Sequence, residues 1–378
     1  MLIKKSDQQV LKVGILLPQS RQYPKAALNF LNGMKLYFTI NENYFERGRA
    51  ELVVEDVGIG TESISVEKAH KLMVQDQVVA ITGLLEPMIG LEVAKMTNMA
   101  DKPTLFSGLG ESAISSAKVS KNLYFNTLQF WQSYFLLGQY IAENLDKPIN
   151  IITSFYDCGY DPLKAFRLGV KSKGRSIHEE VILKAENQEE LKAELNQKPI
   201  SGNDHLYALL LHPNMLRQVM ELSSDQINEM VTTPFYDGKN SSLKYWAFPD
   251  WGEQNSLTDK LRQATREYFE AEPDIFSILG YQQGQLVYEA LKNLSDPGLD
   301  NENIINTWKN FDQETVLGRS FFNPDDHSLK SPISVFKGKS LNDQEILKVA
   351  TFPLYSHHEE MDELYNPKNA YTNPYMFF

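Results

Sequence analysis

Few residues in this sequence stand at spacings that would support catalysis. Cys158 lies beside Asp157 after an apolar run, but no histidine can be assigned as the base that a thiol nucleophile requires, which favours a bystander thiol. Gly58 and Gly60 also follow an apolar run, and Ser63 stands where the dinucleotide fingerprint needs a third glycine. This pattern predicts an ordinary loop rather than a nucleotide site.

Other common signatures of catalysis and metal binding are missing as well. The sequence has no Gly-x-x-x-x-Gly-Lys-Ser/Thr phosphate loop and no Gly-x-Ser-x-Gly nucleophile elbow. The run His357-His358-Glu359-Glu360 holds metal-ligand residue types, but adjacent side chains point apart and the spacing fits no common site. We predict a solvated surface run there, and we expect a protein that is not an enzyme and carries no metal or cofactor.

Length and charge narrow the range of partners. The chain has 378 residues, enough for two or three domain-sized units. Its 37 basic and 49 acidic residues give a net charge of −12, which argues against nucleic acid or an anionic membrane surface as a partner. No apolar run approaches the roughly 20 residues that a spanning helix needs. A single cysteine excludes an intrachain disulfide.

The N-terminus, MLIKKSDQQV, does not read as a secretory signal, because no apolar stretch of about 7–15 residues follows its lysines. The chain is therefore either cytoplasmic or a mature chain with a new start.

Strand and helix patterns alternate along two successive modules. Predicted strands in the first module are 13–18, 52–56, 78–83, 103–107 and 123–125, and in the second 149–153, 177–183, 205–211, 230–233 and 245–248. Predicted helices are 26–40, 66–73, 88–99, 133–145, 162–173, 188–195, 213–222, 256–269 and 273–294, followed by strand candidates at 335–337 and 346–349. This order predicts an α/β protein with parallel sheets covered on both faces. No flexible linker separates the modules, which favours a hinged pair.

In open α/β sheets, ligands bind beyond the carboxyl ends of the strands, so the loops after each predicted strand are the candidate site. Three such loops of the second module carry an aromatic residue next to an acid: Tyr156-Asp157, Tyr236-Asp237 and Asp250-Trp251. Aromatic faces with a few placed polar groups are typical of a small-molecule cleft.

Several stretches, in this order, resemble one family. They are VGILLPQSRQYPKAALNFLNGMKLYFTINE, ELVVEDVGIGTESISVEKAHKLMVQDQVVAITGLLEP, PTLFSG and the late TVLGRSFFNPDDH turn, within a match from about Leu11 to Val349. The chain resembles the substrate-binding proteins of ABC importers with the type I periplasmic-binding fold, in the branched-chain amino-acid (Leu/Ile/Val-binding) family.

The resemblance implies two doubly wound parallel-sheet lobes joined by a three-crossover hinge, with the ligand cleft between them. By position the crossovers fall near Thr127, near 248–251 and near Leu317. Lobe I is then 1–127 plus 252–317, and lobe II is 128–251 plus 318–378.

The resemblance also implies a set of ligand-binding residues. In relatives, hydroxyls and backbone N–H groups after two first-lobe strands hold a carboxylate, and an acid after a second-lobe strand holds an ammonium. The corresponding residues here are Tyr23, Leu85, Glu86, Ser107, Leu109, Gly110, Tyr156, Tyr160, His212, Tyr236 and Asp237. Asp237 matches the acid well. The carboxylate clamp departs from the pattern, because Pro87 cannot donate an N–H, and Glu86 and Glu111 would repel a carboxylate if they point inward.

We therefore expect an extracytoplasmic solute-binding protein, periplasmic or a cell-surface lipoprotein, whose signal sequence is absent from this chain. It would capture a small polar ligand, an amino acid or a related compound, by lobe closure and deliver it to an ABC permease in the membrane. A cationic or amide-like ligand stays open beside a branched-chain amino acid. A ligand-sensing regulator or receptor domain of the same fold and an unrelated α/β enzyme are the alternatives.

Overall fold

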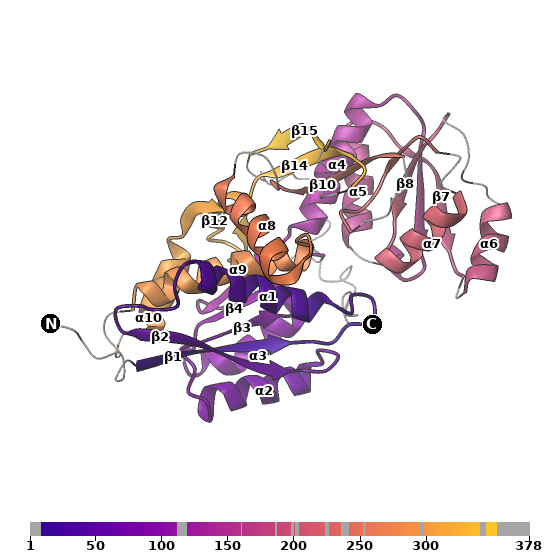
Figure 1. Ribbon diagram of the computed structural model, residues 1–378. Helices are drawn as coiled ribbons and strands as arrows, with labels where there is room; N and C mark the ends of the chain where they lie inside the picture. Colours follow the sequence, from indigo (N-terminus) through magenta and orange to yellow (C-terminus); the bar gives the residue numbers. More distant parts are fainter. Residues whose placement is uncertain are drawn as a thin grey trace.

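The computed structural model describes residues 9–111, 119–159, 161–185, 187–197, 200, 204–223, 227–235, 242–251, 255–294, 298, 300–340 and 345–353. Figure 1 shows two lobes side by side, each a β-sheet flanked by helices. We call the lobe that carries the N-terminal strands the first lobe and the other the second lobe.

The first lobe is built on a five-stranded sheet in the order β2-β1-β3-β4-β5, with parallel pairing throughout. Its strands are β1 (Gln9–Leu17), β2 (Gly48–Asp56), β3 (Ala80–Leu84), β4 (Thr104–Gly108) and β5 (Leu123–Thr127). Its helices are α1 (Ala26–Ile40), α2 (Glu62–Val74), α3 (Pro87–Asn98), α8 (Ser256–Phe269), α9 (Ile275–Lys292) and α10 (Asp300–Lys309). In Figure 1, α2 and α3 lie on one side of the sheet and α1 and α9 on the other.

The buried strands send alternate side chains into two separate cores. Leu105 packs with residues of α1 and α9, whereas its neighbour Phe106 packs with residues of α2 and α3. Both side chains are fully buried, as expected for a parallel strand covered on both faces.

The second lobe is built on a seven-stranded sheet in the order β15-β14-β10-β9-β8-β6-β7. Its strands are β6 (Ile149–Ser154), β7 (Ile177–Leu183), β8 (Leu206–Leu210), β9 (Glu229–Val231), β10 (Leu243–Pro249), β14 (Ile333–Gly338) and β15 (Leu347–Phe352). Its helices are α4 (Phe130–Asn144), α5 (Asp161–Ser172), α6 (Gln188–Gln197) and α7 (Pro213–Ser223). Strands β6 to β10 pair in parallel, whereas β14 and β15 join antiparallel.

Three segments connect the lobes. The chain passes from β5 to α4, from β10 to α8, and back to β14 after a small sheet of β11 (Asp312–Thr315), β12 (Gly318–Phe322) and β13 (Leu329–Lys330). The connecting segments bond to one another, since the Gln129 side chain donates to the Ser331 carbonyl at 3.1 Å and the Asp250 N–H donates to the Pro332 carbonyl at 2.7 Å.

The lobe boundaries stay a proposal, and the pairings favour a third crossing later than Leu317. Ser328 forms a bridge with Phe125 of β5, so β12 and β13 lie beside the first sheet. The chain then reaches the second sheet between Lys330 and Ile333.

The predicted α/β fold is confirmed, and the structure adds elements that the sequence patterns did not predict. Helix α10 was not predicted, although it buries Ile304 and Trp308, which stand four residues apart on one helix face. Strands β14 and β15 lie where strand candidates were predicted, but their antiparallel pairing was not anticipated.

Candidate functional site

Loops that follow strand ends in the two lobes meet at one junction. Tyr23, in the loop after β1, stacks at a tilt on Phe235, which follows β9 in the second lobe, with ring centroids 5.1 Å apart. Phe235 also contacts Phe130 at the start of α4 at 5.1 Å, and Tyr23 contacts Phe276 of α9 at 5.4 Å. Aromatic pairs of this kind contribute about 0.5–1.5 kcal/mol each beyond area burial. The four rings therefore hold the lobes together beside the first connecting segment.

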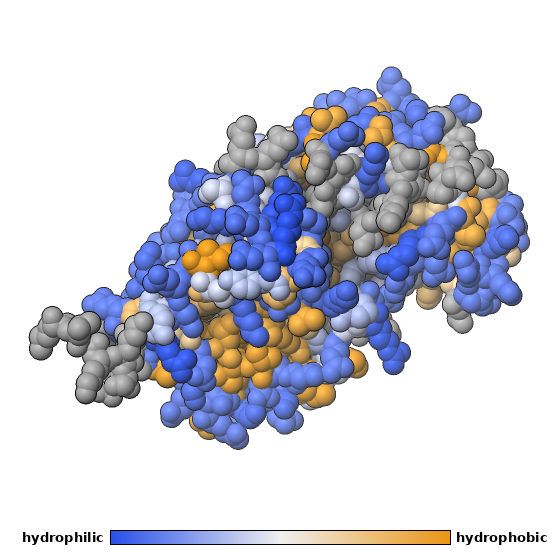
Figure 2. All heavy atoms as spheres, viewed as in Figure 1, coloured by the Kyte–Doolittle hydropathy of each residue, from blue (hydrophilic) through white to orange (hydrophobic). Residues whose placement is uncertain are grey.

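A cavity of about 550 Å³ opens between the lobes next to these rings. Figure 2 shows the surface hollowed between the two lobes. First-lobe residues lining the cavity are Gln22, Tyr23, Pro24, Lys25, Ala26, Glu272, Asp274, Ile275 and Phe276, and second-lobe residues are Pro213, Asn214, Arg217, Pro234, Phe235 and Ser340. Both lobes therefore line one cavity, open to solvent, that is large enough for a small ligand.

On the second-lobe side, one carboxylate organises two strand ends. A single oxygen of Asp157, Oδ2, accepts from the Ser154 hydroxyl at 2.6 Å and from the His212 backbone N–H at 3.0 Å, and lies 2.9 Å from His212 Nδ1. Tyr156 packs its ring edge against the His212 imidazole, with centroids 5.2 Å apart. Tyr134 of α4 also faces this carboxylate, since burial first and the Asp157 charge second raise the pKa of its phenol. The loops after β6 and β8 are thus fixed relative to each other.

We expect Asp157→Ala to destabilise the protein by about 2 kcal/mol or more, because the buried donors of Ser154 and His212 lose their shared acceptor. Chemical denaturation measures the change. Asp146→Ala, at an exposed position, is the matched control and is expected to change stability by less than about 0.5 kcal/mol. Equal stabilities of the two variants would contradict this role of Asp157.

Glu111 is a buried acid of the first lobe. It follows β4, is 1% exposed, and its Oε2 has no hydrogen-bond partner among the described residues. Burial, together with the charge of Asp161 at the start of α5, raises the pKa of Glu111 to about 7, against the lowering effect of the Glu111 and Gly110 N–H groups that donate to the carboxylate. An acid from each lobe therefore lies near the other.

The remaining first-lobe residues of the predicted site are buried inside the first lobe. Leu85 and Leu109 are fully or nearly fully buried in the two cores, and the Ser107 hydroxyl donates to Gln283 of α9 at 2.8 Å. The carbonyls of Leu109 and Gly110 accept from the N–H groups of Phe130 and Trp131 in the first connecting segment, at 3.1 and 3.0 Å. These residues thus support the loops.

Glu86 and Pro87 begin α3 as its N-cap and first residue, and Glu86 is 7% exposed. Among the other predicted ligand residues, Tyr160, Tyr236 and Asp237 lie outside the described residues, as does the run from His357 to Glu360. No role for them is tested by the structure.

The junction also contains residues that sequence reasoning did not assign to the site. Phe276 lies within the predicted helix 273–294 and Phe130 just before the predicted helix 133–145, so nothing in the sequence marked them as partners of Tyr23 and Phe235. Asp161 has a visible signal, since it follows the aromatic–acid loop after β6. Within the described part of the chain, no group of three or more metal-ligating side chains gathers closely enough to hold an ion.

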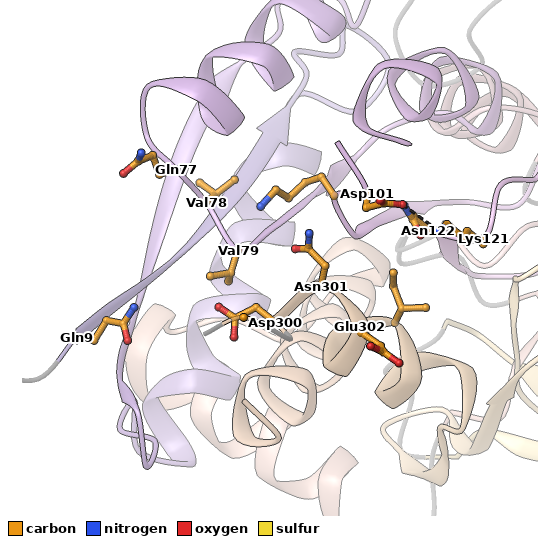
Figure 3. Close-up of a pocket in the computed structure, with 13 residues that line it drawn as sticks. Gln9, Gln77, Val78, Val79, Asp101, Lys121, Asn122, Asp300, Asn301 and Glu302 are labelled. Atoms are coloured by element: carbon orange, nitrogen blue, oxygen red, sulfur yellow. Dashed lines mark ion pairs between the residues drawn. The ribbon is translucent and has the colours of Figure 1, made fainter. Parts of the chain in front are cut away.

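A larger cavity, of about 760 Å³, lies at the opposite end of the first sheet (Figure 3). It is lined by residues that precede β3, β4 and β5 and by residues of α10. Three of its charged side chains are paired, since Lys121 lies 2.9 Å from Asp101 and Asp300 pairs with Arg47. Because ligands of parallel α/β sheets bind at the carboxyl ends of strands, the inter-lobe cavity is the better candidate for a ligand site.

The chain belongs to the periplasmic binding protein family, whose model matches residues 10–344. Similar solved structures are solute-binding proteins of ABC transporters. One from Rhodopseudomonas palustris BisB5, in complex with 3,4-dihydroxybenzoic acid, is 18% identical with a TM-score of 0.73, over 94% of this chain and 99% of that chain. LivJ from Streptococcus pneumoniae, a branched-chain amino-acid transporter substrate-binding protein in complex with isoleucine, is 16% identical with a TM-score of 0.71, over 90% and 99%.

A further neighbour, an R. palustris solute-binding protein in complex with benzoate, is 14% identical with a TM-score of 0.73, over 92% of this chain and 98% of that chain. At these identities the likeness establishes the shared two-lobed fold. No curated protein sequence matches the chain significantly. Among the described helices, none has the length and apolar character required to span a bilayer.

Proposed function

We propose that this protein is the solute-binding component of an ABC importer. It binds a small polar ligand, such as an amino acid or a related compound, between its lobes and delivers that ligand to a membrane permease. The observation that carries the proposal is the inter-lobe cavity, because residues of both lobes line it. A ligand that touches both lobes stabilises the closed arrangement by its differential contacts, and this closed form is the one that a permease can distinguish.

The family and its neighbours support this role, since the similar structures are solute-binding proteins of ABC transporters. Those neighbours were solved with aromatic acids in some cases and with isoleucine in another, so the branched-chain amino-acid branch is one option within the proposal. We place the protein outside the cytoplasm, in the periplasm or at the cell surface, where an importer collects its solute.

A thermal-shift screen followed by X-ray scattering tests the proposal. The screen covers amino acids, amides, amines and aromatic acids, because a ligand that binds only the folded protein raises its melting temperature. At saturation we expect the hit to reduce the radius of gyration as the lobes close. Superimposable scattering curves with and without the bound hit would contradict closure, and chemical conversion of the hit would indicate an enzyme instead.

A further inference from the structure

The larger cavity, at the end of the first sheet away from the other lobe's loops, differs in character from the inter-lobe cavity. Its volume is about 760 Å³, and every described residue that lines it belongs to the first lobe (Figure 3). Most of these side chains are polar. They are the amides Gln9, Gln77, Asn122 and Asn301, the acids Asp101, Asp300 and Glu302, and the lysines Lys102 and Lys121. A cavity of this size accommodates a small organic molecule, and a ligand that touches one lobe needs no lobe closure to bind.

Lys102 is a lysine of this cavity that no acid neutralises. Lys121 lies 2.9 Å from Asp101, and Asp300 pairs with Arg47. Lys102, by contrast, is half-buried and forms no ion pair within the described part of the chain. Burial lowers the pKa of Lys102, against the charge of Asp300. A negative group in the cavity would therefore give this ammonium the counter-charge that it lacks.

A buried amide at the same cavity lacks hydrogen-bond partners. Asn122 is 1% exposed, and neither the oxygen nor the nitrogen of its amide meets a partner at hydrogen-bond geometry among the described residues. The amide lies near enough to the Asp101 carboxylate to help Lys121 lower the pKa of that acid. Figure 3 shows these three residues grouped on one wall, across the cavity from Asn301 of α10. A hydroxyl group satisfies an unmet amide, because it both accepts and donates.

These features define the chemistry of a ligand. One unpaired lysine, Lys102, favours one negative charge, whereas the acids that line the cavity disfavour a polyanion. The acid Glu302 is exposed, so water screens its charge. Amides on several walls favour hydroxyl groups. The apolar side chains among the described lining are Val78, Val79 and Ile305, which give little area to an aliphatic or aromatic acid.

We propose that this cavity binds a small hydroxylated carboxylic acid with a single negative charge, of the sugar-acid type, at a second site independent of the solute between the lobes. Lys102 holds the carboxylate, and the amides of Asn122 and Asn301 bond to hydroxyl groups. Hydrogen bonds between an ammonium and a carboxylate are roughly twice as strong as those between neutral groups. Because the described lining residues all belong to the first lobe, binding leaves the arrangement of the lobes unchanged.

Titration calorimetry on the full chain tests the proposal, with D-gluconate and D-glycerate as probes. The comparisons are D-glucose, hexanoate and citrate, which lack the charge, lack the hydroxyl groups and carry too many charges, respectively. We expect a probe to bind and each comparison to bind at least tenfold more weakly. Lys102→Gln should weaken gluconate binding at least tenfold. Lys260→Gln, at an exposed position of α8 in the same lobe, is the matched control and should leave binding unchanged.

Asp101→Asn tests the charge of the ligand in the opposite direction. Asparagine keeps the shape of the side chain and suits the left-handed backbone of Asp101, whose φ is 49°. The substitution leaves Lys121 without its partner, so an anion in the cavity gains a second cation. Gluconate affinity is therefore expected to rise several-fold. Unchanged or weaker binding of gluconate would overturn the anionic class of ligand.

Failure of this proposal is distinguishable from failure of the proposed function. If neither probe binds at millimolar concentration, or if gluconate binds equally to Lys102→Gln, the second site is overturned and the inter-lobe cavity is unaffected. Equal affinity for glucose or hexanoate would overturn the class of ligand. A reduced radius of gyration with gluconate would place the probe between the lobes and overturn the assignment. Circular dichroism and the melting temperature confirm that Lys102→Gln is folded, as expected when an unpaired, half-buried charge is removed.

Discussion

Replacing Gly280 by alanine is expected to lower the free energy of unfolding by about 3 kcal/mol or more. Gly280 lies in α9 where that helix packs on α1, and a Cβ at this position would lie 1.9 Å from the Phe30 carbonyl oxygen. The contact is with backbone, so no flexible side chain can move aside. On the facing helix, a Cβ at Gly33 would likewise lie 2.1 Å from the Ser277 carbonyl oxygen. The two helices must separate to accommodate either methyl group.

Urea denaturation measures this effect, and Gly284→Ala in the same helix is the control. A Cβ at Gly284 would lie 2.8 Å from Tyr37 Cβ and 2.9 Å from the Met34 carbonyl oxygen, so the required shift is smaller and the loss should be smaller. Helix propensity alone makes the opposite prediction, because alanine favours a helix over glycine by about 1 kcal/mol. A Gly280→Ala protein as stable as the parent would show that helix packing does not dominate here.

Replacing Gln283 by leucine is expected to destabilise the first lobe by about 3–5 kcal/mol, because several buried polar groups lose their partner together. The Gln283 amide group donates to the Leu105 carbonyl at 2.8 Å and to Thr82, and its oxygen accepts from Ser107 at 2.8 Å and from Asn126 at 3.0 Å. One fully buried side chain of α9 therefore ties together β3, β4 and β5.

The matched control is Gln197→Leu, at an exposed position near the end of α6, which should leave stability within about 0.5 kcal/mol. Denaturation curves at equal protein concentration make the comparison. Ser107→Ala should weaken the same network while leaving the affinity for a bound solute unchanged. If Ser107→Ala reduced affinity and not stability, its hydroxyl would contact the ligand rather than support the sheet.

Much of the fold could be predicted from local sequence. Strands such as β4 and β8 are short apolar runs, and helices such as α1 and α9 carry apolar residues at helical spacing, so both kinds of element follow from periodicity. Alternation of these elements also predicts parallel sheets. The antiparallel addition of β14 and β15 could not be predicted in this way, because a short apolar strand carries no sign of its partner's direction.

The candidate site could be predicted in part. An aromatic–acid loop after a strand indicated Tyr156 and Asp157, and the resemblance indicated His212. The structure brings the three residues together after β6 and β8. Ser107 is expected from the resemblance to contact the ligand, and that expectation stays a prediction. The structure adds that its hydroxyl donates to Gln283, 176 residues along the chain. No local pattern reports such a distant partner.

The sequence by itself determined most of the strands and helices and that they form two α/β modules. The spacing of the apolar side chains that each element buries is a local signal, visible within a few residues of sequence. Only the tertiary structure decided which strand ends face one another, and it placed Glu111 of one lobe near Asp161 of the other. Charge and burial depend on distance in space, and the two acids acquire their shared environment only when the lobes meet.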